Sequence, residues 1–240
     1  MIPTQLDGLL LVDKPKGCTS HDVVDFIRRR FQQKKVGHCG TLDPLATGLL
    51  LIVLGKATKV QDLLMAEDKE YRSTMKLGET TDSQDADGKI IETKPVPSLS
   101  RAELEAVFNR FTGDFYQTPP MVSALKRDGV PLYKLARQGK TVERQPRLVH
   151  VYSYEILRVE LPQIEFHIKC SKGFYVRTYC HDIGHILNCG AHLIQLARTR
   201  SGNFSLDSAI RWEELEASAT PDFLVQRILA LPEISRIRRQ

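Results

Sequence analysis

Two short apolar runs, at residues 8–12 and 49–54, place the strongest constraint on how this chain folds. Each run consists almost entirely of leucine, isoleucine and valine, which is typical of a strand buried inside a sheet. Residues 37–48, which precede the second run, contain three glycines and one proline and are predicted to form an irregular loop. A loop framed by buried segments is a suitable place for functional side chains.

A helix is predicted between the first strand and this loop. Thr19 and Ser20 are both favoured at an N-cap, where a side-chain oxygen accepts a hydrogen bond from a backbone N–H. The apolar residues that follow recur at helical spacing and predict one buried stripe, with arginines on the opposite face. The stripe consists of Val23, Val24, Ile27 and Phe31.

The net charge of +5 is modest, but basic residues are concentrated at residues 28–35 and 236–239. Such clusters bind phosphate groups, because each neutralising cation releases counterions. A solvated helix face and a frayed tail would have the same composition. Charge alone leaves both interpretations open.

The rest of the chain mixes strands and helices without a regular βαβ order. Residues 148–161 and 164–170 are β-rich runs separated by a turn at Pro162, which predicts a hairpin. The predicted fold class is therefore α/β or α+β, with a mixed, mostly antiparallel central sheet flanked by helices. Further predicted elements are a strand at 69–77, a helix capped by Ser100 and running through Phe108, a helix at 132–137, and a helix at 175–187 with glycine as its C′ residue.

Composition excludes several classes of protein. With 240 residues, 42% hydrophobic and 26% charged, the chain is not disordered, collagen-like or a coiled coil, and forms one large domain or two small ones. The five cysteines are dispersed and include no C-x-x-C pair, so we expect reduced thiols in a cytoplasmic protein. The longest early apolar run is too short for a signal peptide or a membrane span, so no membrane partner is expected.

Two motifs resemble metal sites without completing one. His181 and His185 have the i, i+4 spacing of a zinc-binding pair, but Asp182 replaces the expected glutamate and no third ligand is marked. Residues 83–94 resemble a calcium loop that lacks its first and last carboxylates. The glycine patterns of nucleotide-binding loops are absent. We therefore expect no metal and no nucleotide cofactor.

Asp43 is the one carboxylate of the 37–48 loop and follows His38 by five residues. Because Pro44 fixes the local dihedral angle, Asp43 is presented from a stiff turn. This arrangement suits a catalytic carboxylate, but a turn or capping aspartate has the same spacing. Spacing alone does not choose between these two roles.

Motifs in a fixed order along residues 8–206 resemble the TruB family of tRNA pseudouridine synthases. The loop that contains Asp43 resembles the catalytic motif of that family, and Lys69-Glu70-Tyr71-Arg72 resembles its tyrosine motif. The other matching segments are Lys14-Pro15 with Gly17, Thr19 and Ser20; the acidic loop at 80–88; Pro119-Pro120-Met121 with Ser123-Ala124-Leu125-Lys126; Leu132-Tyr133 and Ala136-Arg137 with Gly139; residues 170–178; and Gly190-Ala191-His192-Leu193 with Leu196.

This resemblance implies a pseudouridine synthase catalytic domain that isomerises uridine 55 in the TΨC loop of tRNA, without cofactor or metal. Asp43 matches the catalytic nucleophile of the family, and Arg177 matches the arginine that pairs with it. A guanidinium suits that role because it keeps its charge and opposes protonation of a buried carboxylate. Tyr71 matches the tyrosine that stacks on the target base. A further role for Tyr71 in removing the C5 proton is a hypothesis, because a phenol is a poor base at its ordinary pKa.

The resemblance also implies a pocket for a uridine that is flipped out of its RNA loop. His38 matches the histidine that fills the space vacated by the base. Tyr175 and Leu196 match residues that line the uracil pocket. Lys14 and Pro15 are expected to shape and support this pocket rather than to react.

The expected organisation is a catalytic domain at residues 1–206 and a short helical extension at 207–240, without a complete RNA-binding module of the PUA type. The catalytic body is then expected to bind the T-arm of tRNA largely alone, as a monomer that requires no protein partner. One alternative is an RNA chaperone for the T-arm whose catalysis is incidental. Another is a synthase that acts on other RNA, as guide-dependent relatives do, although the missing module argues against that lineage.

Overall fold

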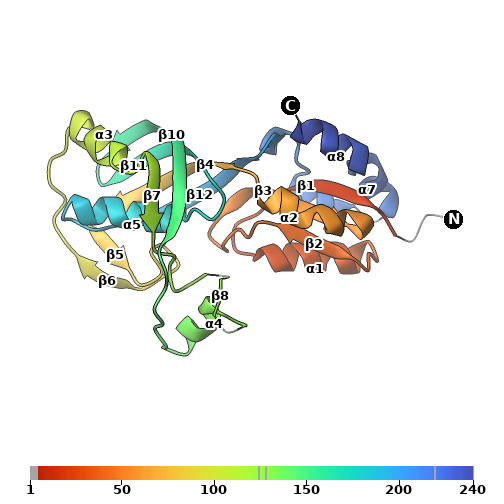
Figure 1. Ribbon diagram of the computed structural model, residues 1–240, viewed down its shortest axis with the longest axis horizontal. Coiled ribbons are helices and arrows are strands. Elements are labelled where there is room, and N and C mark those ends of the chain that lie inside the picture. The colour runs from red at the N-terminus through yellow and green to blue at the C-terminus, as the bar shows by residue number, and fades with distance from the viewer. Residues whose placement is uncertain (1–4, 124, 128, 219, 240) are drawn as a thin grey trace. The chain divides into compact units, whose positions relative to one another are not determined.

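The computed structural model describes residues 5–123, 125–127, 129–218 and 220–239, so Ala124 of the motif that follows Met121 lies outside the described residues. The chain forms two compact units (Figure 1). Unit 1 combines the chain up to Tyr71 with the chain from Ala197 onward, and unit 2 is Arg72–Leu196. The chain passes from one unit to the other inside strands β4 (Lys69–Leu77) and β12 (Ala191–Ser201).

Unit 1 is built on β3 (Thr47–Leu54), which is buried along almost its whole length. Strand β1 (Gly8–Lys14) runs antiparallel to it, from Gly8 opposite Leu54 to Lys14 opposite Gly48. Strand β2 (Val36–Cys39) pairs antiparallel with β3, and the end of β12 pairs parallel with its start. The predicted loop therefore begins later than expected, because its first residues form β2.

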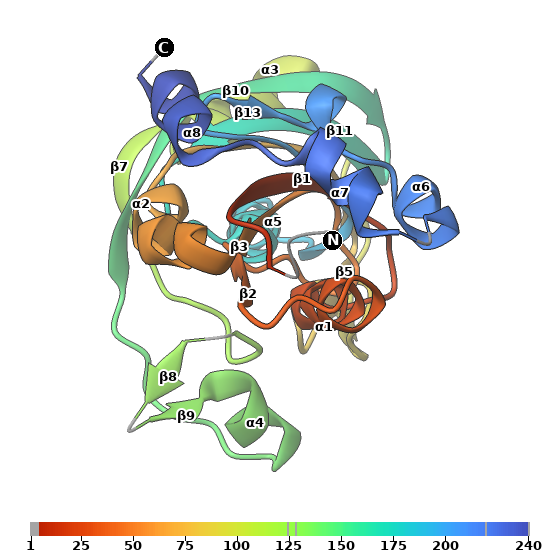
Figure 2. The same cartoon turned by 90° about the vertical axis from the view of Figure 1, so that its right-hand side faces the viewer.

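The helices of unit 1 lie around these strands (Figure 2). Helix α1 (Ser20–Arg30) has Thr19 as its N-cap in a capping box with Asp22, and the predicted apolar stripe is buried. The 3-10 helix η1 (Gly55–Val60) and α2 (Gln61–Met65) follow β3. The C-terminal part contains β13 (Phe204–Ser205), η2 (Leu206–Ser208), α6 (Trp212–Ala217), α7 (Pro221–Arg227) and α8 (Leu231–Arg238).

The segment expected as a helical extension packs into unit 1. The backbones of Leu9 and Leu229 exchange two hydrogen bonds of 2.9 Å, which joins the segment before α8 to β1. Ile234 of α8 is buried in the same apolar cluster as Leu9 and Leu51. The C-terminal helices therefore complete the core of unit 1.

Unit 2 contains strands in the order β4, β11 (Gln163–Cys170), β10 (Arg147–Glu160) and β7 (Gly113–Gln117). The predicted hairpin is confirmed, because β10 and β11 pair antiparallel around the turn at Pro162. Its remaining elements are β5 (Glu79–Thr81), β6 (Ile90–Thr93), α3 (Arg101–Asn109), β8 (Lys126–Arg127), β9 (Val130–Pro131), α4 (Leu132–Arg137) and α5 (Val176–Ile186).

An aromatic core joins the helices of unit 2 to its strands. The ring of Phe108 on α3 lies 5.5 Å from that of Phe166 on β11 and 5.7 Å from that of Tyr179 on α5. All three side chains are buried. The predicted cap of α3 is confirmed, since Ser100 forms a capping box with Glu103.

The predicted end of α5 is wrong in one detail. The first residue beyond the C-cap Leu187 is Asn188, and it adopts the left-handed conformation with φ 57°. Asparagine tolerates this region better than most residues do, so it replaces the expected glycine at C′. Gly190 lies two residues further on and donates its N–H to the carbonyl of Gly184.

The mixed α/β class with a mostly antiparallel sheet is confirmed. Among the described residues, no helix combines the length and the apolar character needed to cross a membrane.

Gly48 tests how tightly the start of β3 is packed. It has φ +94°, and a Cβ atom there would lie 2.5 Å from the carbonyl oxygen of Arg198. Gly113 has a similar φ of +82° but no atom within 4 Å of the same position. We expect Gly113→Ala to cost about 1 kcal/mol from backbone strain and Gly48→Ala to cost roughly 3 kcal/mol or more. Urea unfolding of both variants measures the difference, and equal losses would contradict the close packing at Gly48.

Candidate active site

Asp43 lies in the irregular part of the loop between β2 and β3. It is half-buried, follows the buried Leu42 and precedes the exposed Pro44. Its carbonyl accepts a hydrogen bond of 3.0 Å from the N–H of Ala46, which closes a tight turn. The carboxylate is therefore carried by a short, hydrogen-bonded turn, as the sequence predicted.

A buried arginine joins the start of this loop to β3. The guanidinium of Arg198 donates 2.7 Å from Nε to the carbonyl of Leu49 and 3.1 Å from Nη2 to that of Gly40. Arg198 is 1% exposed, on the part of β12 that pairs with β3. A guanidinium is not deprotonated in proteins, so this side chain brings a permanent positive charge to the base of the loop.

Lys14 is a second buried cation of unit 1. Its Nζ donates 2.9 Å to the carbonyl of Pro15 and 2.7 Å to that of Cys18. Burial lowers the pKa of Lys14, while the charges of Cys18 and Asp43 act in the opposite direction. Lys14 therefore shapes the backbone at the end of β1 and contributes positive charge near Asp43.

His38 and Tyr71 are also placed in unit 1, on β2 and β4. Burial lowers the pKa of His38, and the charge of Arg198 lowers it further, so the neutral imidazole is favoured. Its Nδ1 atom is buried and has no hydrogen-bond partner within the described part of the chain. Tyr71 is 9% exposed, which makes it one of the buried aromatic side chains.

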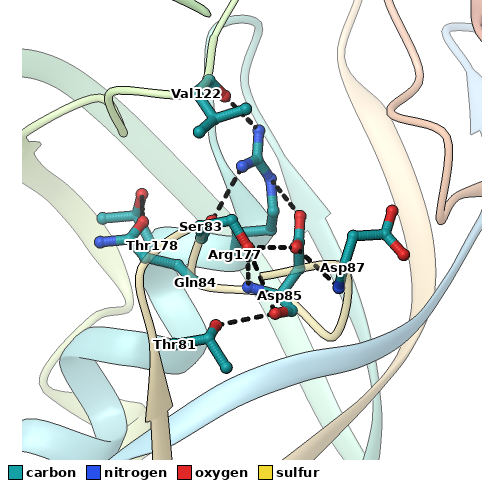
Figure 3. A network of polar contacts seen from close by, with 8 residues as sticks. All are labelled: Thr81, Ser83, Gln84, Asp85, Asp87, Val122, Arg177 and Thr178. Carbon is teal, nitrogen blue, oxygen red and sulfur yellow. Dashed lines mark hydrogen bonds and ion pairs between the residues drawn. The ribbon is translucent and has the colours of Figure 1, made fainter. Parts of the chain in front are cut away.

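Unit 2 holds Arg177 in a polar network (Figure 3). Its Nη1 donates 3.0 Å to the carbonyl of Ser83, and its Nη2 donates 2.8 Å to the carbonyl of Val122. Its Nε lies 3.5 Å from a carboxylate oxygen of Asp85, in an ion pair whose two side chains are only 3% and 6% exposed. Neighbouring groups thus fix the guanidinium from three directions.

Asp85 is itself held by its own loop (Figure 3). Its carboxylate accepts hydrogen bonds from the hydroxyl of Ser83 and from the N–H of Asp87, and its carbonyl accepts one from Thr81. The backbone on either side bonds to Leu193 of β12. The sequence marked this loop as part of the resemblance but did not assign Asp85 to Arg177.

Tyr175 directly precedes α5 and is fixed by an amide. The N–H of Tyr175 donates 2.8 Å to Oε1 of Gln117, and Nε2 of Gln117 donates 3.1 Å to the carbonyl of Tyr175. Gln117 is buried at the end of β7, two residues before Pro119. Leu196, the other residue expected to line the pocket, is half-buried on β12.

His181 of α5 is half-buried and His185 is exposed. Among the described residues, no group of three or more His, Cys, Asp and Glu side chains is placed to hold a metal ion. Burial lowers the pKa of His181 and raises that of Asp182 to about 6. His181 and Asp182 are therefore half-buried residues of α5 whose pKa values differ from the ordinary ones.

Comparison with protein families supplies the decisive observation. Residues 28–176 match the TruB family pseudouridylate synthase (N terminal domain), and residues 177–230 match the tRNA pseudouridylate synthase B C-terminal domain. The chain belongs to the TruB family of pseudouridylate synthases. The resemblance stated from the motifs is confirmed.

Individual relatives of the TruB family agree over most of the chain. A protein of Opitutus terrae named tRNA pseudouridine synthase B is 53% identical over 218 residues, which cover 91% of this chain and 90% of the relative. A protein of the same name from Syntrophotalea carbinolica is 49% identical over 231 residues, covering 96% of this chain and 75% of the relative.

Solved structures show the same fold. A chain of a Cbf5-Nop10-Gar1 complex is 32% identical with a TM-score of 0.68, and the match covers 86% of this chain and 52% of that chain. A chain of an H/ACA RNP bound to a substrate RNA containing 2′-deoxyuridine is 29% identical with a TM-score of 0.65, covering 86% and 51%. This TruB family chain thus spans about half the length of those two structures.

The predicted site residues fall into two groups. Unit 1 contains Lys14, Pro15, His38, Asp43 and Tyr71, and the charge of Asp43 raises the pKa of Lys14. Unit 2 contains Tyr175, Arg177 and Leu196. The pairing of Arg177 with Asp43 remains a prediction.

Sequence reasoning missed three residues that hold these groups in place, namely Arg198, Asp85 and Gln117. Arg198 carried no local signal, because it stands in a mixed run of apolar, polar and charged residues at the end of β12. Asp85 belonged to a recognised motif but was interpreted only as a residue of a polar loop. Gln117 carried no local signal, because its partner lies 58 residues away.

The ion pair of Arg177 with Asp85 predicts a stability difference between two neighbouring carboxylates. We expect Asp85→Ala to lower the free energy of unfolding by about 3 kcal/mol, because it removes one partner of a buried ion pair. Asp87→Ala is the matched control, and as a change of an exposed side chain it should cost less than about 0.5 kcal/mol. Urea unfolding measures both, and equal effects would show that the buried pair contributes nothing.

The raised pKa of Asp182 predicts a pH-dependent stability. In the folded protein the Asp182 carboxyl stays protonated up to about pH 6, whereas in the unfolded chain it loses its proton near pH 3.8. The protonated carboxyl therefore stabilises the folded state fully below pH 3.8, and this stabilisation is lost as the pH rises through 6. Asp182→Asn should therefore be more stable than the parent protein above about pH 7, and this advantage should shrink towards about pH 4. Thermal unfolding across this range checks it, and a pH-independent difference would refute it.

Proposed function

We propose that this chain converts uridine 55 in the TΨC loop of tRNA to pseudouridine, with Asp43 as the nucleophile acting on a flipped-out base. As a TruB family member it is an isomerase, and the relatives named tRNA pseudouridine synthase B support tRNA as its substrate. The observation that carries the site assignment is the half-buried Asp43 on a hydrogen-bonded turn, in a loop whose start is joined to β3 by Arg198.

The reaction needs a nucleophile and a pocket that retains a detached base. The C1′–N1 bond breaks, the uracil turns, and a new C1′–C5 bond forms while C5 loses a proton and N1 gains one. An ionised carboxylate provides the nucleophile, since it can form a covalent intermediate. Attack by Asp43 at C6 of the ring and attack at C1′ of the sugar are both compatible with this role.

Charge at the site keeps the carboxylate reactive. We assign Arg177 as the partner of Asp43, because a guanidinium beside a buried carboxylate opposes its protonation. Lys14 lies close enough to Asp43 for the two charges to interact. Tyr71 is assigned to stack on the target base.

The remaining residues are assigned to the flipped nucleotide. His38 fills the space that the base vacates, and its buried, neutral imidazole is suited to an uncharged neighbour. Tyr175 and Leu196 line the uracil pocket, and Lys14 and Pro15 support it.

The proposal includes the mode of RNA binding. The T-arm of tRNA is the expected contact, made by a monomer without a protein partner in the cytoplasm. Residues 1–206 are assigned as the catalytic domain and 207–240 as its helical extension.

The arginines at the end of α1 differ in their contacts. Arg28 forms an ion pair with Asp25, and Arg30 donates a hydrogen bond to the carbonyl of Ser218. The exposed Arg29 is therefore the arginine of this cluster best placed to contact phosphate.

Replacing the nucleophile tests this function. We expect Asp43→Asn to lower turnover by at least about 1,000-fold, because the amide cannot form the covalent bond. tRNA affinity should stay within a few-fold, since phosphate contacts are unchanged. Tritium release from tRNA labelled at uracil C5 measures turnover, and filter binding measures affinity.

The control for this experiment is Asp62→Asn, which changes an exposed carboxylate on α2 of the same unit. It should retain full activity. Normal tritium release by Asp43→Asn would overturn the assignment of the nucleophile.

A further inference from the structure

Ser20 connects the start of α1 to the loop of the proposed nucleophile. Its hydroxyl accepts a hydrogen bond of 2.8 Å from the N–H of Leu42 and donates one of 3.1 Å to the carbonyl of the same residue. Ser20 is 1% exposed and Leu42 is 3% exposed, so both bonds are shielded from water. A single side chain therefore fixes both backbone polar groups of the residue that precedes Asp43.

The other side of Asp43 is held by the same segment. The N–H of Gly17 donates 2.8 Å to the carbonyl of Pro44. Leu42 and Pro44, the two neighbours of Asp43 in sequence, are thus bound by residues that lie more than twenty positions earlier in the chain. Together these contacts hold the backbone of Asp43 from both sides.

The neighbouring Thr19 has a different role from Ser20, because it caps the helix. Thr19 is the N-cap of α1, and its hydrogen bonds go to Asp22 of the same helix. The hydrogen bonds of Ser20 go to the loop instead. Two adjacent hydroxyl groups therefore serve the helix and the loop separately.

We propose that Ser20 is a positioning residue for the isomerisation, because its hydroxyl fixes the backbone of Leu42 and thereby the direction of the Asp43 carboxylate. This inference rests on the proposed function of Asp43. A nucleophile must lie within about 3 to 3.5 Å of the atom that it attacks, and a displacement of about 1 Å can lower a rate by 100-fold. Ser20 acts through the backbone and does not touch the substrate.

The test compares Ser20→Ala with Thr19→Ala in single-turnover assays with enzyme in excess over tRNA. We expect Ser20→Ala to lower the single-turnover rate by about 10- to 100-fold. tRNA affinity should stay within about threefold, because the phosphate contacts are unchanged. Thr19→Ala loses a helix cap and should unfold at a lower temperature, yet keep its rate within about twofold.

Two results would overturn the proposal: a parent rate in Ser20→Ala, or an equal loss of rate in Thr19→Ala. If Ser20→Ala does not fold, Ser20→Cys replaces it, because a thiol hydrogen-bonds weakly and should also slow the reaction. A parent rate in that variant would likewise overturn the proposal. Asp43→Asn is assayed in parallel. Normal activity of that variant would contradict Asp43 as the nucleophile, whereas a parent rate in Ser20→Ala alone would contradict the role of Ser20.

Discussion

The structure of unit 1 depends on one buried guanidinium that binds two carbonyls far away in sequence, one at the start of the loop and one on β3. Arg198 contacts Leu49 and Gly40, which precede it by 149 and 158 residues. Burying a cation is costly unless its donors are satisfied, so this side chain favours the one arrangement in which β12 meets the loop. The glycine at position 48 has a separate cause, since the backbone of Arg198 leaves no room for a side chain there.

Two buried cations and one neutral histidine give the loop its electrostatic character. Lys14 and Arg198 bring positive charge to unit 1, and Arg198 also disfavours protonation of His38. A positive surrounding favours the ionised form of a carboxylate and opposes the effect of burial. The residues that shape the backbone around Asp43 thus also make its surroundings positive.

The sequence predicted what local patterns encode. Apolar periodicity located β1, β3, β4 and the β10–β11 hairpin, and capping residues located α1 and α3. Motifs located the family and its matching residues. Three residues were missed because their partners lie far away in sequence. The separation is up to 158 residues for Arg198, 92 residues for Asp85 and 58 residues for Gln117. No local pattern states such a pairing.

The network around Arg177 shows how one arginine joins α5 to two other segments of unit 2. A guanidinium has five N–H donors. The contacts to Asp85, Ser83 and Val122 each use a different nitrogen. One guanidinium thereby holds α5, the acidic loop and the segment of Val122 together within unit 2. Because Asp85 is negative and buried, it offsets part of the cost of burying the guanidinium, which stabilises this arrangement of α5 and the acidic loop.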